Sequence, residues 1–478
     1  MLTTDEIKLF IDEDNASTLK KAAREGQDYY EGKHDILDYR MFYYDANGDL
    51  KEDKTRSNVK IPHPYFAELV DQGTEYMLSG EDGIFQSDDP ALQKWLDLYF
   101  NHNRRFKAEL SETITGQQAK GFDYMYCYKG KEDRLVFENA DCLGVVEVEG
   151  RFTEDKKDQR IYRYVDRIDK DGHTQWKILV IDDENTYYYC QQNDGKIEED
   201  KSVEINPKPH ALYVGKNEKL YTKPFGFLPF FRLDMNKKRR SLLNPVKPLI
   251  DDYDIMASSL TNNLIDFDHP LHVVKGFDGD NLDELQQNLK TKKIVGVDEE
   301  GGIEVHTVNI PYEARIAKLE LDEKGIYKFG MGLNLAGLKD TAATTNIAIK
   351  AAYSLLELRC KKMQEQVEMF LEAITEPVLA EINEKEGTNF RIEHVKFVFN
   401  PEIMSNAQEN AQVELTEAQK KQTEVTTLQN VATLLDNETL MKLICEQLDI
   451  DYEDIKDKLP KHDEDPYKVQ IPGGGVIE

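Results

Sequence analysis

Residues 45–49, Asp-Ala-Asn-Gly-Asp, have the residue types of a calcium-binding loop. Such a loop also needs Gly at its sixth position and Glu at its twelfth, because the chain must turn sharply and close the coordination shell. Those two positions hold Leu50 and Arg56. The passage therefore predicts an ordinary turn, for which Asp, Asn and Gly are the usual residues.

A second stretch, Gly330-x-Gly332-x-x-x-x-Gly337-x-Lys339, has the residue types of a phosphate-binding loop. A P-loop follows a strand and joins its last glycine directly to Lys and then to Ser or Thr. Here Leu338 separates the glycine from the lysine, and a helical pattern precedes the stretch. We therefore predict a flexible joint between two helices, in which the glycines supply backbone freedom.

The histidines and cysteines complete no recognisable metal or catalytic motif. His269 and His272 flank a proline without a third ligand at zinc spacing, and the five cysteines form no Cys-x-x-Cys pair. The sequence contains neither a Gly-x-Ser-x-Gly elbow nor the kinase motifs. Lys237–Arg240 is its one basic run, for which a solvated loop is favoured over a contact patch. We predict no enzyme activity, no cofactor and no bound metal.

The composition is that of an acidic chain with enough apolar residues for a core. Its 478 residues correspond to about three domains at roughly 150 residues each, and 40% of them are hydrophobic, which excludes wholesale disorder. Its 61 Lys and Arg against 91 Asp and Glu give a net charge of -30, unlike the basic surface of conventional nucleic-acid-binding proteins. The sequence lacks an apolar run of membrane-helix length and a signal-peptide layout. We expect a soluble protein made inside the cell, with free thiols.

Hydrophobic periodicity predicts an α+β fold. Helical spacing covers much of residues 1–121, including a stretch at 91–121, and β-branched and aromatic runs at 122–235 predict an antiparallel β region. The later predicted elements are, in order, a helix at 248–268, a small α/β segment at 270–310, a helix at 311–329, a very long helix at 346–374 that ends before Pro377, a strand at 390–399 and an acidic helical region at 405–458.

Eight short passages, in this order of elements, resemble those of one family. They are Tyr29-Tyr30-x-Gly32, Asn58-x-x-Ile61-Pro62-x-Pro64-Tyr65, Leu78-Ser79-Gly80, Pro224-Phe225-Gly226-x-x-Pro229-Phe230, Leu249-Ile250-Asp251-x-Tyr253-Asp254, Val274-Lys275-Gly276, Ile326-Tyr327-x-Phe329-Gly330-Met331-Gly332 and Ala351-x-x-Ser354-Leu355-Leu356-x-Leu358. On these passages the chain resembles the portal proteins of tailed bacteriophages, of the type found in siphophages of Gram-positive hosts. The resemblance covers nearly the whole chain.

The resemblance implies a portal fold. This α+β fold has a mixed α/β wing, long stem helices, a small α/β clip, a long kinked tunnel helix and a helical C-terminal crown. The implied limits are 1–245 for the N-terminal helical and β-rich wing, 246–330 for the stem with the clip at 270–310, 331–400 for the tunnel loop, tunnel helix and return strand to the wing, 401–460 for the crown and 461–478 for a flexible tail.

The resemblance also implies a role without catalysis. A portal protein forms a dodecameric ring at one capsid vertex, the channel through which terminase packages genomic DNA and from which that DNA is later ejected. The implied partners are other copies of the chain, the terminase large subunit, a head-to-tail adaptor, the major capsid and scaffolding proteins, and double-stranded DNA that passes without sequence-specific binding; no membrane is implied. The implied location is the virion, and the host cytoplasm during assembly.

Three sets of residues are implied to serve that role. The tunnel loop would offer to the DNA Leu335, Leu338, Lys339 and Asp340. The stem acids that would line the channel are Asp251, Asp252, Asp254 and Glu320. The clip residues that would dock terminase and adaptor are Asp278, Asp280, Asn281 and Asp298. An acidic wall suits a conduit, because each neutralised phosphate strengthens a contact that would hold the DNA in place. A solvated outer face is the alternative for the stem acids, and a plain linker is the alternative for the loop.

Other functions stay open at this point. Another ring-forming head-tail connector of the virion is the first alternative, although such adaptors are usually smaller. A cytosolic enzyme with no recognisable motif is the second. An acidic scaffolding protein is the third, and the β-rich middle of the chain argues against it.

Overall fold

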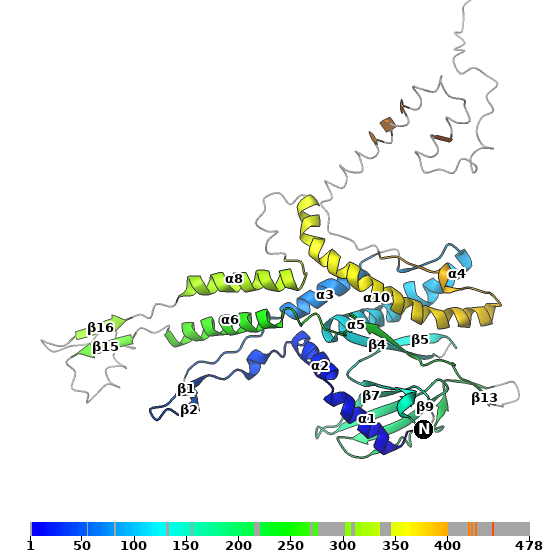
Figure 1. Cartoon of the computed structure of the whole chain (residues 1–478), viewed down its shortest axis with the longest axis horizontal. Helices are drawn as coiled ribbons and strands as arrows, with labels where there is room; N and C mark the ends of the chain where they lie inside the picture. The colour runs from blue at the N-terminus through cyan, green and yellow to red at the C-terminus, as the bar shows by residue number, and fades with distance from the viewer. Residues whose placement is uncertain are drawn as a thin grey trace, which may run out of the picture. The chain divides into compact units, whose positions relative to one another are not determined.

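The computed structural model describes most of the chain up to residue 399 (Figure 1). The described residues are 2–54, 56–80, 83–130, 133–153, 156–214, 220–267, 271–275, 302–306, 311–334 and 346–399, with a few helical positions between 419 and 443. The chain divides into two compact units, 1–340 with 351–403 and 341–350 with 404–478. Nearly all described residues belong to the first unit.

Two capped helices and a hairpin begin the chain. Helix α1 (Thr4–Ala16) starts at a capping box made by Thr3 and Glu6, and Ser17 caps α2 (Thr18–Tyr30). Strands β1 (Phe42–Tyr44) and β2 (Leu50–Glu52) then form an antiparallel hairpin. Its turn is the predicted one, because a carboxylate oxygen of Asp45 accepts the N–H groups of Asn47 and Asp49 at 2.9 and 3.0 Å.

Three helices follow the hairpin. They are α3 (Tyr65–Leu78), α4 (Pro90–Leu96) and α5 (Arg104–Lys120), with the two-residue strand β3 (Phe85–Gln86) between the first two. The helical stretch predicted at 91–121 is thus interrupted. Asn103 causes the break, because its side chain accepts the N–H groups of Arg105 and Phe106 and so begins a new helix.

The β region predicted at 122–235 is confirmed as antiparallel. The strands are β4 (Phe122–Lys129), β5 (Leu135–Ala140), β6 (Val145–Val148), β7 (Gln159–Ile168), β8 (Thr174–Ile181), β9 (Asn185–Gln192), β10 (Ile197–Glu199), β11 (Lys208–Pro209), β12 (Ala211–Val214), β13 (Leu220–Lys223) and β14 (Phe230–Asp234). One sheet has the order β10-β9-β8-β7-β6 with β11 on β9, and a second has the order β14-β4-β5. Strands β12 and β13 form a separate hairpin.

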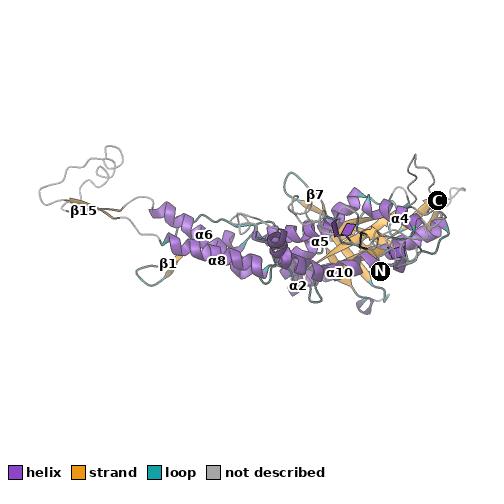
Figure 2. Ribbon diagram, turned by 90° about the horizontal axis from the view of Figure 1, so that it is seen from above, coloured by secondary structure: helices purple, strands orange, loops and turns teal. Residues whose placement is uncertain are grey.

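Two long helices extend from the helices and sheets described above, which we call the body of the unit. Helix α6 (Lys247–Phe267) and helix α8 (Tyr312–Phe329) match the helices predicted at 248–268 and 311–329. They pack side by side, as both views show (Figures 1 and 2). Between them, β15 (Leu271–Lys275) pairs with β16 (Gly302–His306). The rest of the small α/β segment predicted at 270–310 lies outside the described residues.

Helix α10 (Asn346–Glu386) is longer than predicted. The prediction that it ends before Pro377 is wrong, because Val378, Leu379 and Ile382 continue its buried face into the core. Their burial outweighs the roughly 3 kcal/mol that a proline costs inside a helix. The strand predicted at 390–399 is reduced to β17 (Lys396–Phe397), which pairs with β3, after a 3₁₀ turn at Ile392–His394.

Two of the four apolar clusters among the described residues hold α10 and the α6–α8 pair to the rest of the unit. The larger one packs α10 residues such as Val367 and Phe370 against α3, α4, α5 and the β4–β5 hairpin. The second joins α2, α3, α6 and α8 through Tyr29, Phe66 and Ile326. The inner ends of the α6–α8 pair are therefore embedded in the body of the unit.

Candidate functional site

Helices α6 and α8 carry the four stem acids and run antiparallel. Lys318 of α8 pairs with Asp252 of α6, and further along α8 a Cβ on Gly325 would lie 3.2 Å from Leu249 of α6. Moving forward along one helix thus means moving back along the other. The pair therefore forms a two-helix extension of the body, with charged residues on its surface.

Three of the stem acids are at least partly exposed. Asp251 accepts the Tyr29 hydroxyl and pairs with Lys247 at 3.0 Å, so it faces the N-terminal helices. Asp252 is half-exposed beside Lys318, which also binds Asp322. Glu320 is the most exposed, with 63% of its side chain accessible and only Lys324 near it at 3.7 Å.

Asp254 is a correction to the predicted set. Its side chain is fully buried, with one oxygen 2.6 Å from His34 Nδ1 and the other 2.8 Å from His63 Nδ1. The backbone N–H of His63 also donates to it at 2.9 Å. The channel-lining role predicted for Asp254 does not fit this placement, because the carboxylate faces the interior of its own subunit.

The Asp254 carboxylate is ionised and lies against the ring of His34. Burial alone would raise the pKa of Asp254, but the hydrogen bonds from His34 and His63 outweigh it and leave the pKa below the ordinary value. His34 Nε2 lies 3.2 Å from the Tyr29 carbonyl oxygen, so both ring nitrogens of His34 lie close to oxygen atoms. The imidazole ring also stacks on Tyr29, with ring centroids 4.5 Å apart.

An extended segment, residues 57–63, lies along α6, and we call it the strap. Its alternate N–H groups donate to side chains that are four residues apart on the helix. The pairs are Ser57 to Asp266 (3.1 Å), Val59 to Asn262 (2.7 Å), Ile61 to Ser258 (3.1 Å) and His63 to Asp254 (2.9 Å). The match is geometric, because two residues of extended chain advance roughly 6.6 Å and four helical residues advance about 6 Å.

The chain that follows α8 is anchored by two side chains. Gln72 of α3 accepts the N–H of Leu333 at 2.8 Å and donates to its carbonyl at 2.9 Å. Arg359 of α10 is 3% exposed and donates to the carbonyls of Gly330 and Leu69 at 3.0 and 2.7 Å. One arginine thus joins α10, α8 and α3 at the start of the predicted tunnel loop.

The first glycines of that stretch serve close packing. A Cβ on Gly330 would lie 2.5 Å from a methyl group of Leu69, and one on Gly332 would lie 2.2 Å from another. Gly330 has an ordinary helical conformation, with φ at -76°. The expectation that these two glycines supply backbone freedom is therefore wrong: they let the chain pass close to α3.

The other predicted site residues lie outside the described part of the chain. These are the tunnel-loop residues Leu335, Leu338, Lys339 and Asp340 and the clip residues Asp278, Asp280, Asn281 and Asp298. The crown predicted at 401–460 and the tail predicted at 461–478 also lie outside it, apart from a few helical positions.

Two groups of metal-ligand types occur among the described residues. Asp123, Asp141 and Cys142 come together, but the Lys120 ammonium lies between the two carboxylates at 3.0 and 2.8 Å. Burial raises the pKa of the Cys142 thiol, which keeps it protonated and a poor ligand. The second group lies in the exposed turn 169–173, where Asp169 accepts two backbone N–H groups as turn residues do.

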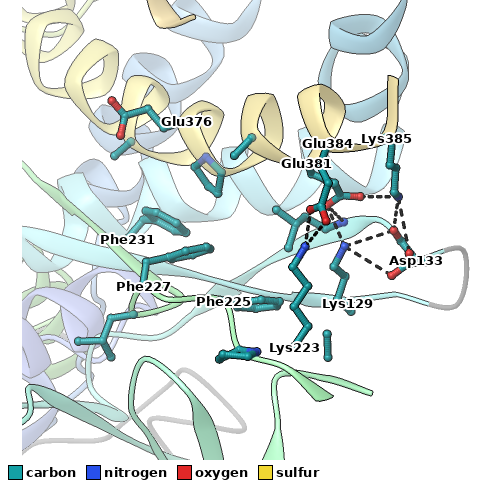
Figure 3. Close-up of a pocket in the computed structure, with 17 residues that line it drawn as sticks. Lys129, Asp133, Lys223, Phe225, Phe227, Phe231, Glu376, Glu381, Glu384 and Lys385 are labelled. Atoms are coloured by element: carbon teal, nitrogen blue, oxygen red, sulfur yellow. Dashed lines mark hydrogen bonds and ion pairs between the residues drawn. The ribbon is translucent and has the colours of Figure 1, made fainter. Parts of the chain in front are cut away.

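A cavity of about 820 Å³ lies between α10, the β4–β5 hairpin and the chain before β14 (Figure 3). Phe225, Phe227 and Phe231 line its apolar part. At its rim Glu381 binds Lys129 at 3.1 Å and Lys385 at 2.7 Å. The cavity can accept an apolar group, and its lining residues include no serine, cysteine or histidine that could act as a nucleophile or base.

The similarity of the sequence to known proteins shows which protein family the chain belongs to. A family model described as phage portal protein, SPP1 Gp6-like, matches residues 10–454. The chain belongs to this family. The portal protein of Bacillus phage SPP1 is 28% identical over 368 residues, which is 76% of this chain and 70% of that protein. The portal protein of Clostridium phage phiCD119 is 27% identical over 160 residues, 32% of this chain and 35% of that protein.

Chains from two neck structures overlap in part with this portal chain. A chain from the neck of an empty GTA particle, computed with C6 symmetry, has a TM-score of 0.38 and 12% identity, and covers 80% of this chain and 90% of its own. A chain from the neck of the native particle, computed with C12 symmetry, has a TM-score of 0.35 and 11% identity, with coverages of 80% and 89%. Both TM-scores are below 0.5, so these overlaps alone establish no common fold.

Family membership confirms several predictions. Portal proteins are structural components of the phage virion at the capsid vertex, where they connect head and tail, so the prediction of a non-enzymatic portal protein is confirmed. The predicted α+β class is confirmed by the helices and antiparallel sheets of the unit. Among the described residues, no helix combines the length and the apolar character that crossing a membrane requires.

Sequence reasoning missed the residues that fix the stem to the body. No quoted passage contains His34 or Arg359, and His63 occupies only an unspecified position in the passage from Asn58 to Tyr65. One signal was present for the strap, since Asp254, Ser258, Asn262 and Asp266 place polar groups four residues apart on a helix that is otherwise largely apolar.

Proposed function

We propose that this portal protein assembles into a ring of twelve subunits at one capsid vertex. Its central channel would carry double-stranded DNA inward during packaging by the terminase and outward during ejection, and its outer end would bind the head-to-tail adaptor. The observation that carries the proposal is the family match over residues 10–454, which spans nearly all elements of the fold. Assembly would take place in the host cytoplasm, together with the major capsid and scaffolding proteins.

The parts of the chain are proposed to take the following places in the ring. Residues 1–245 form the wing, 246–330 the stem with the clip at 270–310, 331–400 the tunnel loop, tunnel helix and return to the wing, 401–460 the crown, and 461–478 the tail. The projecting α6–α8 pair supports the stem, since its inner ends are embedded in the body and its outer ends lead to β15 and β16.

The charge of the chain supports a conduit that does not hold DNA. At -30 per subunit, a ring of twelve would carry a formal charge of -360. Each phosphate neutralised by a protein cation adds salt-dependent affinity, whereas an acidic wall repels the duplex from all sides and leaves it free to slide. We propose that Glu320 and Asp252, with Asp251 at the inner end of α6, contribute to this wall.

Transient contacts with DNA are proposed for the loop that begins after Leu333. Leu335, Leu338, Lys339 and Asp340 would face the duplex from each subunit. The clip residues Asp278, Asp280, Asn281 and Asp298 would face the terminase and later the adaptor. The anchor at Gly330–Leu333 supports the loop assignment, because Gln72 and Arg359 hold its first residues on the body.

A packaging assay separates this proposal from that of a different head-tail connector. Procapsids assembled with and without the chain are mixed with terminase, ATP and DNA, and nuclease-protected DNA is measured. A portal protein is required for protected DNA to accumulate. If procapsids without the chain fill normally and fail only to join tails, the chain is a later connector and the packaging proposal is overturned.

A further inference from the structure

The hairpin of β1 and β2, together with its described flanking residues 39–41, 53–54 and 56, forms a projection that we call the arm. Every residue of both strands is exposed. An isolated two-stranded hairpin is marginally stable in water and needs a hydrophobic partner to order it. The arm nevertheless has a defined root, since the strap that follows it is bound along α6 over residues 57–63.

One face of the arm is apolar and uncovered within the described part of the subunit. Phe42 and Tyr44 lie on the same face of β1, and Leu50 is the cross-strand partner of Tyr44. Their exposed fractions are 56%, 73% and 58%. Three large apolar side chains gathered on one exposed face mark a surface that binds another protein surface.

A second exposed apolar surface lies on α8. Tyr312 and Ile316 are four residues apart, so they lie on one face of the helix, and they are 55% and 44% exposed. Because α6 and α8 are antiparallel, the start of α8 lies level with the end of α6 at which Val59 and Ser57 are bound. The arm and the α8 surface are thus at the same height along the helix pair.

The two surfaces lie on opposite sides of α6. Asp254 faces the strap and Asp252 faces α8, and two residues correspond to about 200° around a helix. Figure 1 likewise shows the strap and arm on one side of α6 and α8 on the other. In a closed ring of identical subunits, one side of each subunit meets the opposite side of the next.

The charges of the two surfaces permit this contact. Residues 39–56 contain four basic and four acidic residues, and α8 likewise contains four of each. Both segments are therefore neutral in a chain whose net charge is -30. Two copies can approach through these segments without bringing net negative charges together.

We propose that the arm of each subunit packs its Phe42–Tyr44–Leu50 face on Tyr312 and Ile316 of the neighbouring copy in the ring. The occupant of each surface is a second copy of this chain. The contact clamps adjacent stems together at their outer ends, and the strap transmits it to α6. The inference rests on the ring of the proposed function, and it adds which surfaces close that ring.

Cysteine cross-linking in purified rings of the full chain tests the contact. The double variant Tyr44→Cys with Ile316→Cys is treated with a short bismaleimide and resolved on a denaturing gel. We expect a ladder of covalent oligomers that extends to the full ring. The matched control pairs Tyr44→Cys with Leu321→Cys, an exposed residue of α8 about 140° around the helix from Ile316, and should give no ladder.

The outcomes separate the two levels of the proposal. Rings that form but give no Tyr44–Ile316 ladder, or an equal ladder with Leu321, overturn the arm contact and leave the ring intact. A chain that forms no ring overturns the proposed function, and the arm contact with it. A cross-link within one subunit leaves the protein at the monomer position on the gel and also contradicts the proposal.

Assembly provides a second readout that does not depend on cross-linking. Replacing Phe42 and Tyr44 by serine should raise the protein concentration needed for ring formation about tenfold or more, because two large side chains lose their burial. The control Tyr43→Ser lies on the other face of β1 and should change it little. Monomer melting temperatures should be equal in both variants, and a loss of assembly that is equal in both contradicts the contact.

Discussion

Asp254 binds two elements of the N-terminal region to α6 through its two carboxylate oxygens. One oxygen lies 2.6 Å from Nδ1 of the buried His34, and the other contacts both the ring and the backbone N–H of His63. This position lies at the inner end of the strap. The residue therefore decides whether the strap begins in register on the helix.

Asp254→Asn should destabilise the subunit by about 3 kcal/mol, because an amide has only one accepting oxygen where the buried carboxylate uses both, so buried N–H groups lose their acceptor. Asp252→Asn is the matched control two residues away, where the ion pair with Lys318 is solvent-exposed and worth below about 1 kcal/mol. Urea unfolding at neutral pH measures both values. Equal losses in the two variants would show that Asp254 is not a structural centre.

The same pair of proteins gives a prediction on pH. The pKa of Asp254 is below its ordinary value of 3.8, so its contribution is present above that pH and is lost as the pH falls through the folded-state pKa. The difference in unfolding free energy between wild type and Asp254→Asn should thus shrink as the pH falls from about 5 towards 3. A difference that grows over this acidic range would contradict the assignment of an ionised carboxylate.

Arg359 is a second single residue on which the fold depends, because it holds the start of the predicted tunnel loop. Arg359→Met removes both hydrogen bonds to the carbonyls of Gly330 and Leu69 and should cost about 2–3 kcal/mol. Lys361→Met is the control on the same helix, with its side chain 70% exposed, and should stay within about 0.5 kcal/mol. Thermal unfolding of both variants measures these losses. If Arg359→Met leaves the stability unchanged, Arg359 does not anchor the start of the loop.

At the scale of elements, the strap explains why a short extended segment is ordered without a sheet. Each of its alternate N–H groups finds an acceptor on α6, so α6 replaces the neighbouring strand of a ladder. Because the acceptors are side chains, the attachment depends on their identity. A strand paired with another backbone would tolerate the same substitutions.

Asn262→Ala should free the middle of the strap. Asn262 accepts the N–H of Val59 and donates to its carbonyl, so amide exchange at Val59 should accelerate about tenfold or more. Asn263→Ala, one residue further along α6, is the control and should leave the exchange rate unchanged. Hydrogen exchange measured by NMR or mass spectrometry decides between them, and equal acceleration in both would mean that the strap is held by general packing.

Elements with strong periodicity were predictable, and the contacts between elements were not. The bounds of α6 and α8 follow from their apolar spacing to within two residues. The pairing of β14 with β4 joins segments about a hundred residues apart, which no local pattern encodes. Pro377 misled the prediction for α10, because the burial of the residues after it depends on the core that they meet.

The candidate site shows the same division. From the sequence, Asp254 could not be distinguished from Asp251 and Asp252, since all three lie on the same predicted helix. Only the fold reveals that the strap covers one side of α6 and buries Asp254. The sequence predicts that Gly330 and Gly332 supply backbone freedom, whereas in the structure Leu69 lies against them and leaves no room for a side chain. Sequence order identified the family and the helix pair. It could not tell which faces of that pair meet solvent.

At the scale of the whole molecule, the stem acids can be tested by their charge. We expect Asp252→Asn with Glu320→Gln to slow DNA packaging, because a less repulsive wall lets the duplex stay longer on the channel surface. The control Glu198→Gln with Glu199→Gln removes the same charge from the two exposed residues of strand β10 and should leave the rate unchanged. Packaging rates that are equal in the two double variants would exclude the acids from the lumen.

The mass and the image of the purified protein test the central claim most directly. Native mass measurement and negative-stain microscopy should show a ring with a central hole and a mass near twelve times 55.2 kDa, either from the chain alone or after expression with its capsid and scaffolding proteins. A chain that stays monomeric or dimeric under both conditions, or forms a closed particle without a channel, would contradict the account of this protein as a conduit.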